Sequence, residues 1–180
     1  MRVAVYGGSF NPPHVAHAMV AAWLLWTEQV DEVWLIPVYH HAFEGQQDKK
    51  LAVYEDRVAW CRALAQDVGS GVRVDTIESL LPRPSYTIDT LRALSSSHPE
   101  HRFRLVIGAD VLPQLPRWRD WEAIESEFAP VVVGREGFDG AGHGVCFPQV
   151  SSTEIRRRLS VGDPVDHLLT RSVRELLVKS

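Results

Sequence analysis

The sequence is poor in cysteine, has no long apolar run and carries no excess of positive charge. Its two cysteines, Cys61 and Cys146, are too few and too far apart for a disulfide framework or a zinc knuckle. No apolar stretch reaches the roughly 20 residues that cross a bilayer, and residues 2–6 are too short a run for a signal-peptide core. A formal net charge of -4 argues against nucleic acid or an anionic membrane as the main partner. We therefore expect a soluble protein of the cytoplasm.

The chain of 180 residues fits one domain, residues 1–180, because that length can bury most of its unfolded surface in one core. Short apolar runs alternate along it with segments whose apolar residues recur at helical spacing. A strand, helix, strand order implies parallel pairing through right-handed crossovers. The sequence therefore predicts the α/β class, with an open, mostly parallel sheet and helices on both faces. The predicted strands are residues 3–6, 33–38, 72–74, 103–107 and 129–133, and the predicted helices are residues 14–28, 54–66, 87–95, 118–125 and the tail.

The first predicted strand ends in a glycine turn that is followed by two histidines. Gly7, Gly8 and Ser9 follow the strand, and a helix begins near His14, so free helix N–H groups face the turn. His14 and His17 project from one side of the first helical turn, where their imidazoles could donate to phosphate. An isolated pair of this spacing is more often a surface or capping pair, and a metal site would need a third ligand. The segment predicts an anion site that is neither a dinucleotide-binding fingerprint nor a P-loop.

A second helix start with free N–H groups is predicted near the C-terminus. Ser151 and Glu154 have the spacing of a capping box, and Arg156 adds a planar fork of donors that suits phosphate oxygens. Taken alone, the segment is better explained as a capped surface helix with a solvated basic stripe. Together with the glycine turn, it predicts two anion sites in one chain, which suits a nucleoside triphosphate better than a single phosphate.

Both segments resemble signatures of the nucleotidylyltransferase superfamily. Residues 7–17 are similar to its Gly-x-Phe-Asp-Pro-x-His-x-Gly-His pattern, with Asn11 in place of Asp and Ala16 in place of Gly. The C-terminal segment is similar to its Ile-Ser-Ser-Thr-x-Ile-Arg pattern, with Val150 in place of the leading Ile. The resemblance implies a single Rossmann-like domain in which the helical part at residues 151–180 completes the ATP site. It also implies catalytic roles for His14, His17 and Arg156, and an ATP site made of Gly7, Gly8, Ser9, Phe10, His14, His17, Gly108, Asp110, Ser151, Ser152, Thr153 and Arg156.

Three further stretches resemble the nicotinate-nucleotide adenylyltransferases within that superfamily. Residues 85–91 are similar to the family's Ser-Tyr-Thr-x-Asp-Thr-Leu stretch, residues 108–110 to its Gly-Ala-Asp motif and residues 117–121 to its tryptophan-containing helix. The resemblance implies that AMP passes from ATP to nicotinate mononucleotide, giving deamido-NAD and pyrophosphate in NAD biosynthesis. It also implies Mg²⁺ that is carried mainly by the ATP phosphates.

The residues that the resemblance assigns to the substrates have plainer alternatives. Tyr86, Thr87 and Trp118 would bind the acceptor, with the indole of Trp118 stacked on the pyridine ring. From the residues alone, Trp118 could instead cap the core. Asp110 could be the N-cap of a helix, and Arg135 could face either phosphate or solvent.

Two loops and the exact reaction stay open. The loop after the second predicted strand lacks the family's Pro-His-Lys run, and His41, Lys49 and Lys50 are its candidate replacements. The glycine-rich segment Gly134–Gly144 is predicted to be a mobile loop without an assigned role. Nicotinamide mononucleotide and phosphopantetheine are alternative acceptors, and a non-catalytic nucleotide-binding regulator is an alternative of another class. The sequence makes no prediction of the oligomeric state.

Overall fold

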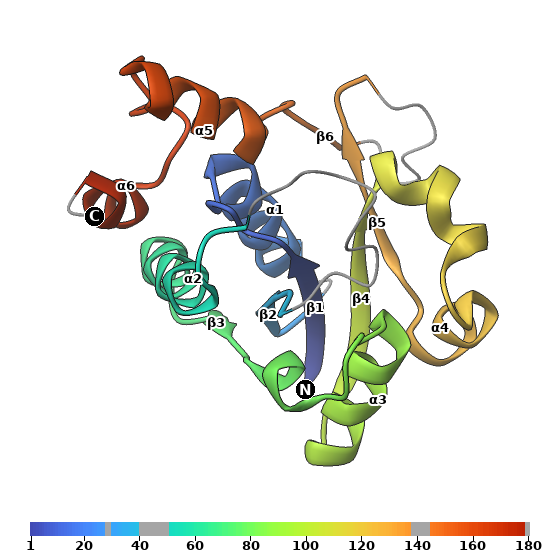
Figure 1. Ribbon diagram of the computed structural model, residues 1–180. Coiled ribbons are helices and arrows are strands. Elements are labelled where there is room, and N and C mark those ends of the chain that lie inside the picture. Colours follow the sequence, from blue (N-terminus) through green and yellow to red (C-terminus); the bar gives the residue numbers. More distant parts are fainter. Residues whose placement is uncertain (28–29, 40–50, 138–144, 179–180) are drawn as a thin grey trace.

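Six strands form one sheet at the centre of the molecule (Figure 1). The computed structural model describes residues 1–27, 30–39, 51–137 and 145–178. All strand pairings within these residues are parallel. The predicted α/β class with a parallel sheet is therefore confirmed. The strands are β1 (Arg2–Gly8), β2 (Glu32–Pro37), β3 (Val72–Val74), β4 (Arg102–Gly108), β5 (Val131–Arg135) and β6 (Cys146–Phe147).

Helices cover both faces of the sheet, as predicted. Successive side chains of a strand point to opposite faces, so Ala4 packs in one core while Val3 and Val5 pack in another. The core around Ala4 is covered by α1 (Val15–Trp26), α2 (Tyr54–Val68), α5 (Ser152–Val161) and α6 (Arg171–Val178). The core around Val3 and Val5 is covered by the 3₁₀ turn η1 (Ile77–Leu80), α3 (Thr87–Ser97), the 3₁₀ stretch η2 (Ala109–Arg117) and α4 (Trp121–Phe128).

The strand order β3-β2-β1-β4-β5-β6 places a topological reversal at the middle of the sheet. Val5 of β1 pairs with Trp34 of β2 on one side and with Leu105 of β4 on the other. Strands β2 and β3 therefore follow one another on one side of β1, and strands β4, β5 and β6 follow one another on its other side. At such a reversal the loops after the two central strands diverge and leave a crevice for a ligand. Gly8 and Gly108 stand at the ends of these two strands.

The second half of the chain differs in detail from the prediction. The helix predicted at residues 118–125 begins only at Trp121, because residues 118–120 form a turn between η2 and α4. β6 was not predicted, because two residues are too few to show an apolar alternation. Gly134 and Arg135 belong to β5 and not to the predicted loop, of which residues 138–144 lie outside the described part.

The C-terminal helices share a core with the first two helices. Ile155 of α5 and Val173 of α6 have no exposed surface and pack in the same cluster as Leu24 and Leu64. α5 lies next to α1 (Figure 1), and Ser152 and Arg156 of α5 bond to the main chain just before α1. None of the helices in the described part of the chain has both the length and the apolar character needed to cross a bilayer.

Candidate active site

The turn after β1 is folded tightly against a buried phenylalanine. Phe10 has a φ of 45°, in the left-handed region, and only 2% of its surface is exposed. A Cβ atom at Gly8 would lie 3.2 Å from the ring of Phe10. Gly7 has no such neighbour, since no described atom lies within 4 Å of a Cβ placed there. Gly7 and Gly8 belong to the end of β1 and not to the predicted turn after it. The space beside Gly7 is open to a ligand, and the strained backbone at Phe10 is of the kind that recurs at functional sites.

The two histidines stack at the start of α1. His14 is the N-cap residue, and its main-chain N–H donates to Nδ1 of His17 over 3.1 Å. Their ring centroids are 3.7 Å apart, with 23° between the ring planes. Because Nδ1 of His17 accepts this bond, the neutral ring carries its proton on Nε2. His17 therefore offers an N–H donor from a ring whose orientation is fixed by the helix start.

Burial and nearby charge favour the neutral form of both histidines. Burial, followed by the charge of Arg135, lowers the pKa of His14 to about 3. The pKa of His17 is also held well below its usual range, first by burial and then by His14 and Arg135. Nδ1 of His14 is buried and has no hydrogen-bond partner among the described residues. A buried polar atom without a partner is unusual, which makes this group a candidate for contact with a ligand.

Arg135 links the carboxyl end of β5 to η2 and to the chain just before α5. From the end of β5, its Nη1 donates to Oδ2 of Asp110 over 2.6 Å and its Nη2 to the carbonyl of Val150 over 3.2 Å. A Cβ atom at Gly108 would come within 3.0 Å of Oδ1 of Asp110. Glycine at position 108 therefore leaves the space in which the carboxylate pairs with Arg135. Asp110 is engaged with an arginine, and its side chain makes no helix-capping bond.

The two predicted anion sites are in direct contact. The hydroxyl of Ser152 donates to the carbonyl of Pro12 over 2.8 Å, and Nη1 of Arg156 donates to the carbonyl of Asn11 over 2.6 Å. Ser151 is the N-cap of α5, and its Oγ accepts from the main-chain N–H of Glu154. The N-cap half of the predicted capping box is therefore confirmed.

Other polar side chains of α5 bond to one another within the helix. The carboxylate of Glu154 accepts from Arg157 and Arg158, which satisfies it within the helix. The reciprocal bond of a capping box, from the main chain of Ser151 to Glu154, is not among the bonds of the described residues. Nη2 of Arg156 donates to Thr153 over 3.3 Å, so this arginine is oriented by its own helix as well as by the first loop.

A cavity of about 80 Å³ lies between the start of α1 and the ends of β4 and β5. Its lining includes His14, His17, Gly108, Asp110 and Arg135. The structure therefore brings the histidine pair together with the Gly-Ala-Asp motif at the reversal of the sheet. The other residues predicted to bind ATP lie outside this lining: Gly7, Gly8, Ser9, Phe10, Ser151, Ser152, Thr153 and Arg156.

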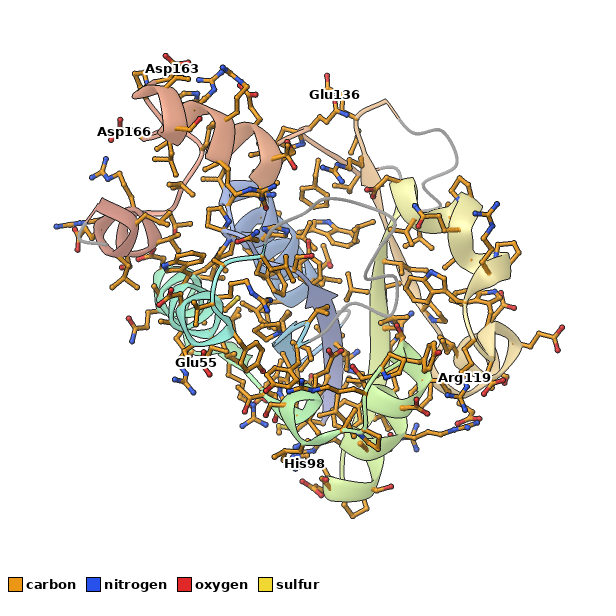
Figure 2. All side chains as sticks on the ribbon, viewed as in Figure 1. Glu55, His98, Arg119, Glu136, Asp163 and Asp166 are labelled. Atoms are coloured by element: carbon orange, nitrogen blue, oxygen red, sulfur yellow. The ribbon has the colours of Figure 1, made fainter. Side chains whose placement is uncertain are left out.

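The residues predicted to bind the acceptor lie on the other core. Tyr86 is the N-cap of α3, Thr87 is its first residue, and the side chain of Tyr86 makes no capping bond. The guanidinium of Arg119 lies 4.8 Å from the centre of the Tyr86 ring, in the region where α3 meets α4 (Figure 2). Trp118 follows η2 and does not belong to α4, which corrects its predicted place in a helix. Its ring packs edge to face on Trp121 at 6.2 Å.

Arg57 was missed by reasoning from the sequence. It has 1% of its surface exposed, and it donates to the carbonyl of Ser9 over 2.9 Å and to that of Ala52 over 3.2 Å. Asn11 accepts from the N–H of Ala52, so the side-chain oxygen of Asn serves as one of Asp would. Arg57 shares a helix face with the buried Cys61, and a charge at a core position of α2 was a usable signal.

A group with metal-ligand chemistry lies away from this site. Ligand atoms of His98, Glu100 and His101 lie within 4.8 Å of one another. They precede β4, at the opposite end of the sheet from Glu136, which follows β5 (Figure 2). This group therefore belongs to a different region from the cavity. His41, Lys49 and Lys50 lie outside the described residues.

Two helix starts joined at the reversal of a parallel sheet form an arrangement suited to a nucleotide. The cytidylyltransferase-like family matches residues 5–158 of the chain. A protein of Anaeromyxobacter sp. (strain K), named a probable nicotinate-nucleotide adenylyltransferase, is 42% identical over 174 residues, covering 95% of this chain and 90% of its own. A protein of Myxococcus xanthus with the same name is 38% identical over 175 residues, covering 96% of this chain and 90% of its own. The chain belongs to the nicotinate-nucleotide adenylyltransferase family.

A solved structure supports the fold independently. The nicotinic acid mononucleotide adenylyltransferase of Plasmodium falciparum, solved in complex with NaAD, is similar with a TM-score of 0.79. The match covers 99% of this chain and 95% of that chain at 19% sequence identity. The Rossmann-like fold expected from the sequence is therefore confirmed.

Proposed function

We propose that this chain transfers AMP from ATP to nicotinate mononucleotide in the cytoplasm, as a step of NAD biosynthesis. An oxygen of the acceptor's 5′-phosphate attacks the α-phosphorus of ATP, and the bond from that phosphorus to the bridging oxygen of the pyrophosphate breaks. The products are deamido-NAD and pyrophosphate. The observation that carries the proposal is the contact of Ser152 and Arg156 with the main chain of the first loop, because it unites two anion-binding helix starts.

Catalysis rests on positioning and on charge, and it needs no protein nucleophile. The attacking phosphate is already an anion, so no strong base has to remove a proton. Nε2–H of His17 donates to an oxygen of the α-phosphate, and His14 contacts the same group. Negative charge that gathers there in the transition state favours protonated imidazole, and it therefore strengthens the hydrogen bonds that both rings donate.

The triphosphate is held between the two helix starts. Main-chain groups of residues 7–10 approach the α-phosphate, while the start of α5 and Arg156 hold the β- and γ-phosphates. The C-terminal part from residue 151 onward thus completes the ATP site. Mg²⁺ enters as part of the substrate, bound to the phosphates and to water. Asp110, the carboxylate of the described cavity, is paired with Arg135, so it positions that arginine on the adenosine side of the site.

The start of α3 receives the pyridine carboxylate of the acceptor. Its uncapped N–H groups at Tyr86 and Thr87 donate to both carboxylate oxygens, and the helix dipole favours negative charge there. The amide of nicotinamide mononucleotide would place its NH₂ group, a donor, against the main-chain N–H donors at the start of α3. The face of Trp118 stacks on the pyridine ring. This arrangement favours nicotinate over nicotinamide.

The test is an assay of pyrophosphate release from ATP with three acceptors in parallel. We expect release with nicotinate mononucleotide, and a kcat/KM at least about tenfold lower with nicotinamide mononucleotide, because of the unmatched donors. Phosphopantetheine should give no release. Release with phosphopantetheine alone would overturn the acceptor, and tight ATP binding without release from any acceptor would establish the regulator in place of the enzyme.

A further inference from the structure

Glu78 is the only buried carboxylate among the described residues, with 9% of its surface exposed. It lies in η1, outside every motif that the sequence offered. Burial raises the pKa of this carboxyl group, while hydrogen bonds that it accepts from Tyr39, Thr90 and Ser85 act in the opposite direction. A carboxylate is costly to bury unless donors surround it, so its position calls for an explanation.

The two oxygens of Glu78 join three segments of the chain. The main-chain N–H of Tyr39, just after β2, donates to Oε2 over 3.0 Å. The hydroxyl of Ser85, just before α3, lies 3.4 Å from the same oxygen. The hydroxyl of Thr90, in the second turn of α3, donates to Oε1 over 3.2 Å. The N–H of Tyr39 can only donate, so Oε2 is an acceptor, while the two hydroxyls are able to donate to the carboxyl group as well.

These bonds leave the start of α3 open. A helix start is commonly capped by the hydroxyl of a serine or threonine at the N-cap position. Here the hydroxyl of Ser85 is turned to Glu78, and the N-cap residue Tyr86 makes no side-chain capping bond. The first N–H groups of the helix, from Thr87 onward, have no partner within the helix itself. They are the groups that an anionic part of a ligand would meet.

We propose that Glu78 is a positioning residue for the acceptor. It keeps the first N–H groups of α3 free for a ligand, and it holds the start of α3 at a fixed position relative to Tyr39, which follows β2. The proposal rests on the proposed function, since it takes the carboxylate of nicotinate mononucleotide as the group that meets the helix start. Glu78 does not touch the acceptor. It acts through Thr90 and Ser85, which flank the N–H groups that bind.

A glutamine at this position is a sharp probe. It has nearly the shape of glutamate, but one of its two acceptors becomes an NH₂ donor. Either the N–H of Tyr39 then faces a donor, or the hydroxyl of Thr90 must turn to accept, and both outcomes change the bonds beside the start of α3. The start of α3 then shifts or closes, whereas the loop at Gly7 and the start of α5 keep their own contacts. The effect should therefore fall on the acceptor and spare ATP.

The experiment measures the KM of each substrate separately in Glu78→Gln and Thr90→Val. We expect the KM for nicotinate mononucleotide to rise about tenfold in Glu78→Gln and less in Thr90→Val, with the KM for ATP within about twofold of wild type. Thr90→Val keeps the shape of the side chain and removes only one donor, so it remains informative if Glu78→Gln folds poorly. Thermal unfolding establishes that each variant is folded.

Glu127→Gln is the matched control. Glu127 is an exposed carboxylate that pairs with Arg92 of α3 at 2.6 Å, so the change removes a partner of the same helix away from its start. Both KM values should stay at the wild-type level. A folded Glu78→Gln with unchanged acceptor KM, or with both KM values raised alike, overturns the positioning role. Wild-type protein that gives no pyrophosphate with nicotinate mononucleotide overturns the proposed function as well.

Discussion

Gly7→Ala should separate ligand binding from folding. The added Cβ meets no described atom within 4 Å, and Gly7 does not have the left-handed φ that would strain alanine. Alanine also restricts the unfolded chain more than glycine does. We therefore expect the free energy of unfolding to stay unchanged or to rise by about 0.5 kcal/mol. Gly8→Ala is the contrast, because its Cβ would press on the ring of Phe10 at 3.2 Å and should destabilise the fold.

The same methyl group should weaken the binding of ATP. A phosphate oxygen that accepts from the main chain near Gly7 must lie in the space that the methyl would take. We expect the KM for ATP to rise on the order of tenfold or more, equivalent to about 1.4 kcal/mol. ATP should raise the unfolding temperature of wild type and raise that of Gly7→Ala much less. A variant with the full shift and a normal KM would show that no ligand lies against Gly7.

Two other changes probe the cavity. Gly108→Ala brings a Cβ within 3.0 Å of Oδ1 of Asp110, so the carboxylate must shift and its bond to Arg135 is disturbed. Unfolding and ATP titrations should show a loss of up to about 1 kcal/mol of stability and a raised KM for ATP, and an unchanged KM would contradict this. His17→Asn keeps an acceptor for the N–H of His14 but loses Nε2–H, so turnover should fall about 10²-fold in folded protein. Because the pKa of His17 is lowered on folding, the unfolded chain takes up a proton below about pH 6.5 and the native protein does not. Wild type should therefore lose stability as the pH falls from about 6.5 to 5, by up to about 1.4 kcal/mol per pH unit for this group, and urea unfolding should show a shallower fall in His17→Asn; equal slopes would contradict the shift.

Local patterns predicted the parts of the site and could not predict how they join. The N-cap role of Ser151 follows from its spacing to Glu154, and the structure has that bond. The contact of Ser152 with Pro12 depends on how α5 packs on the core, which no local pattern contains. Reasoning from local patterns therefore stopped at two separate anion sites.

Two buried charges show where a sequence signal existed and where it did not. Arg57 occupies an apolar face of α2, so helical periodicity marks it as unusual. Glu78 lies in a 3₁₀ turn of four residues, which is too short to have a buried face in the sequence pattern. Trp118 was placed in a helix because its neighbours resemble one, although Asp120 has a left-handed φ of 52° and α4 therefore begins only at Trp121.

Because α5 bonds to the first loop, the two halves of the proposed ATP site are made at different times during synthesis of the chain. A chain made from its N-terminus displays the glycine turn and His14 early, but Ser152 and Arg156 emerge only after all six strands. The unfinished chain can therefore form much of its sheet while it still lacks α5, the second of the two helix starts proposed to hold the triphosphate. In the proposed site, full stabilisation by ATP therefore requires that α5 has been synthesised and packed, so a chain that stalls before α5 gains less protection from its substrate.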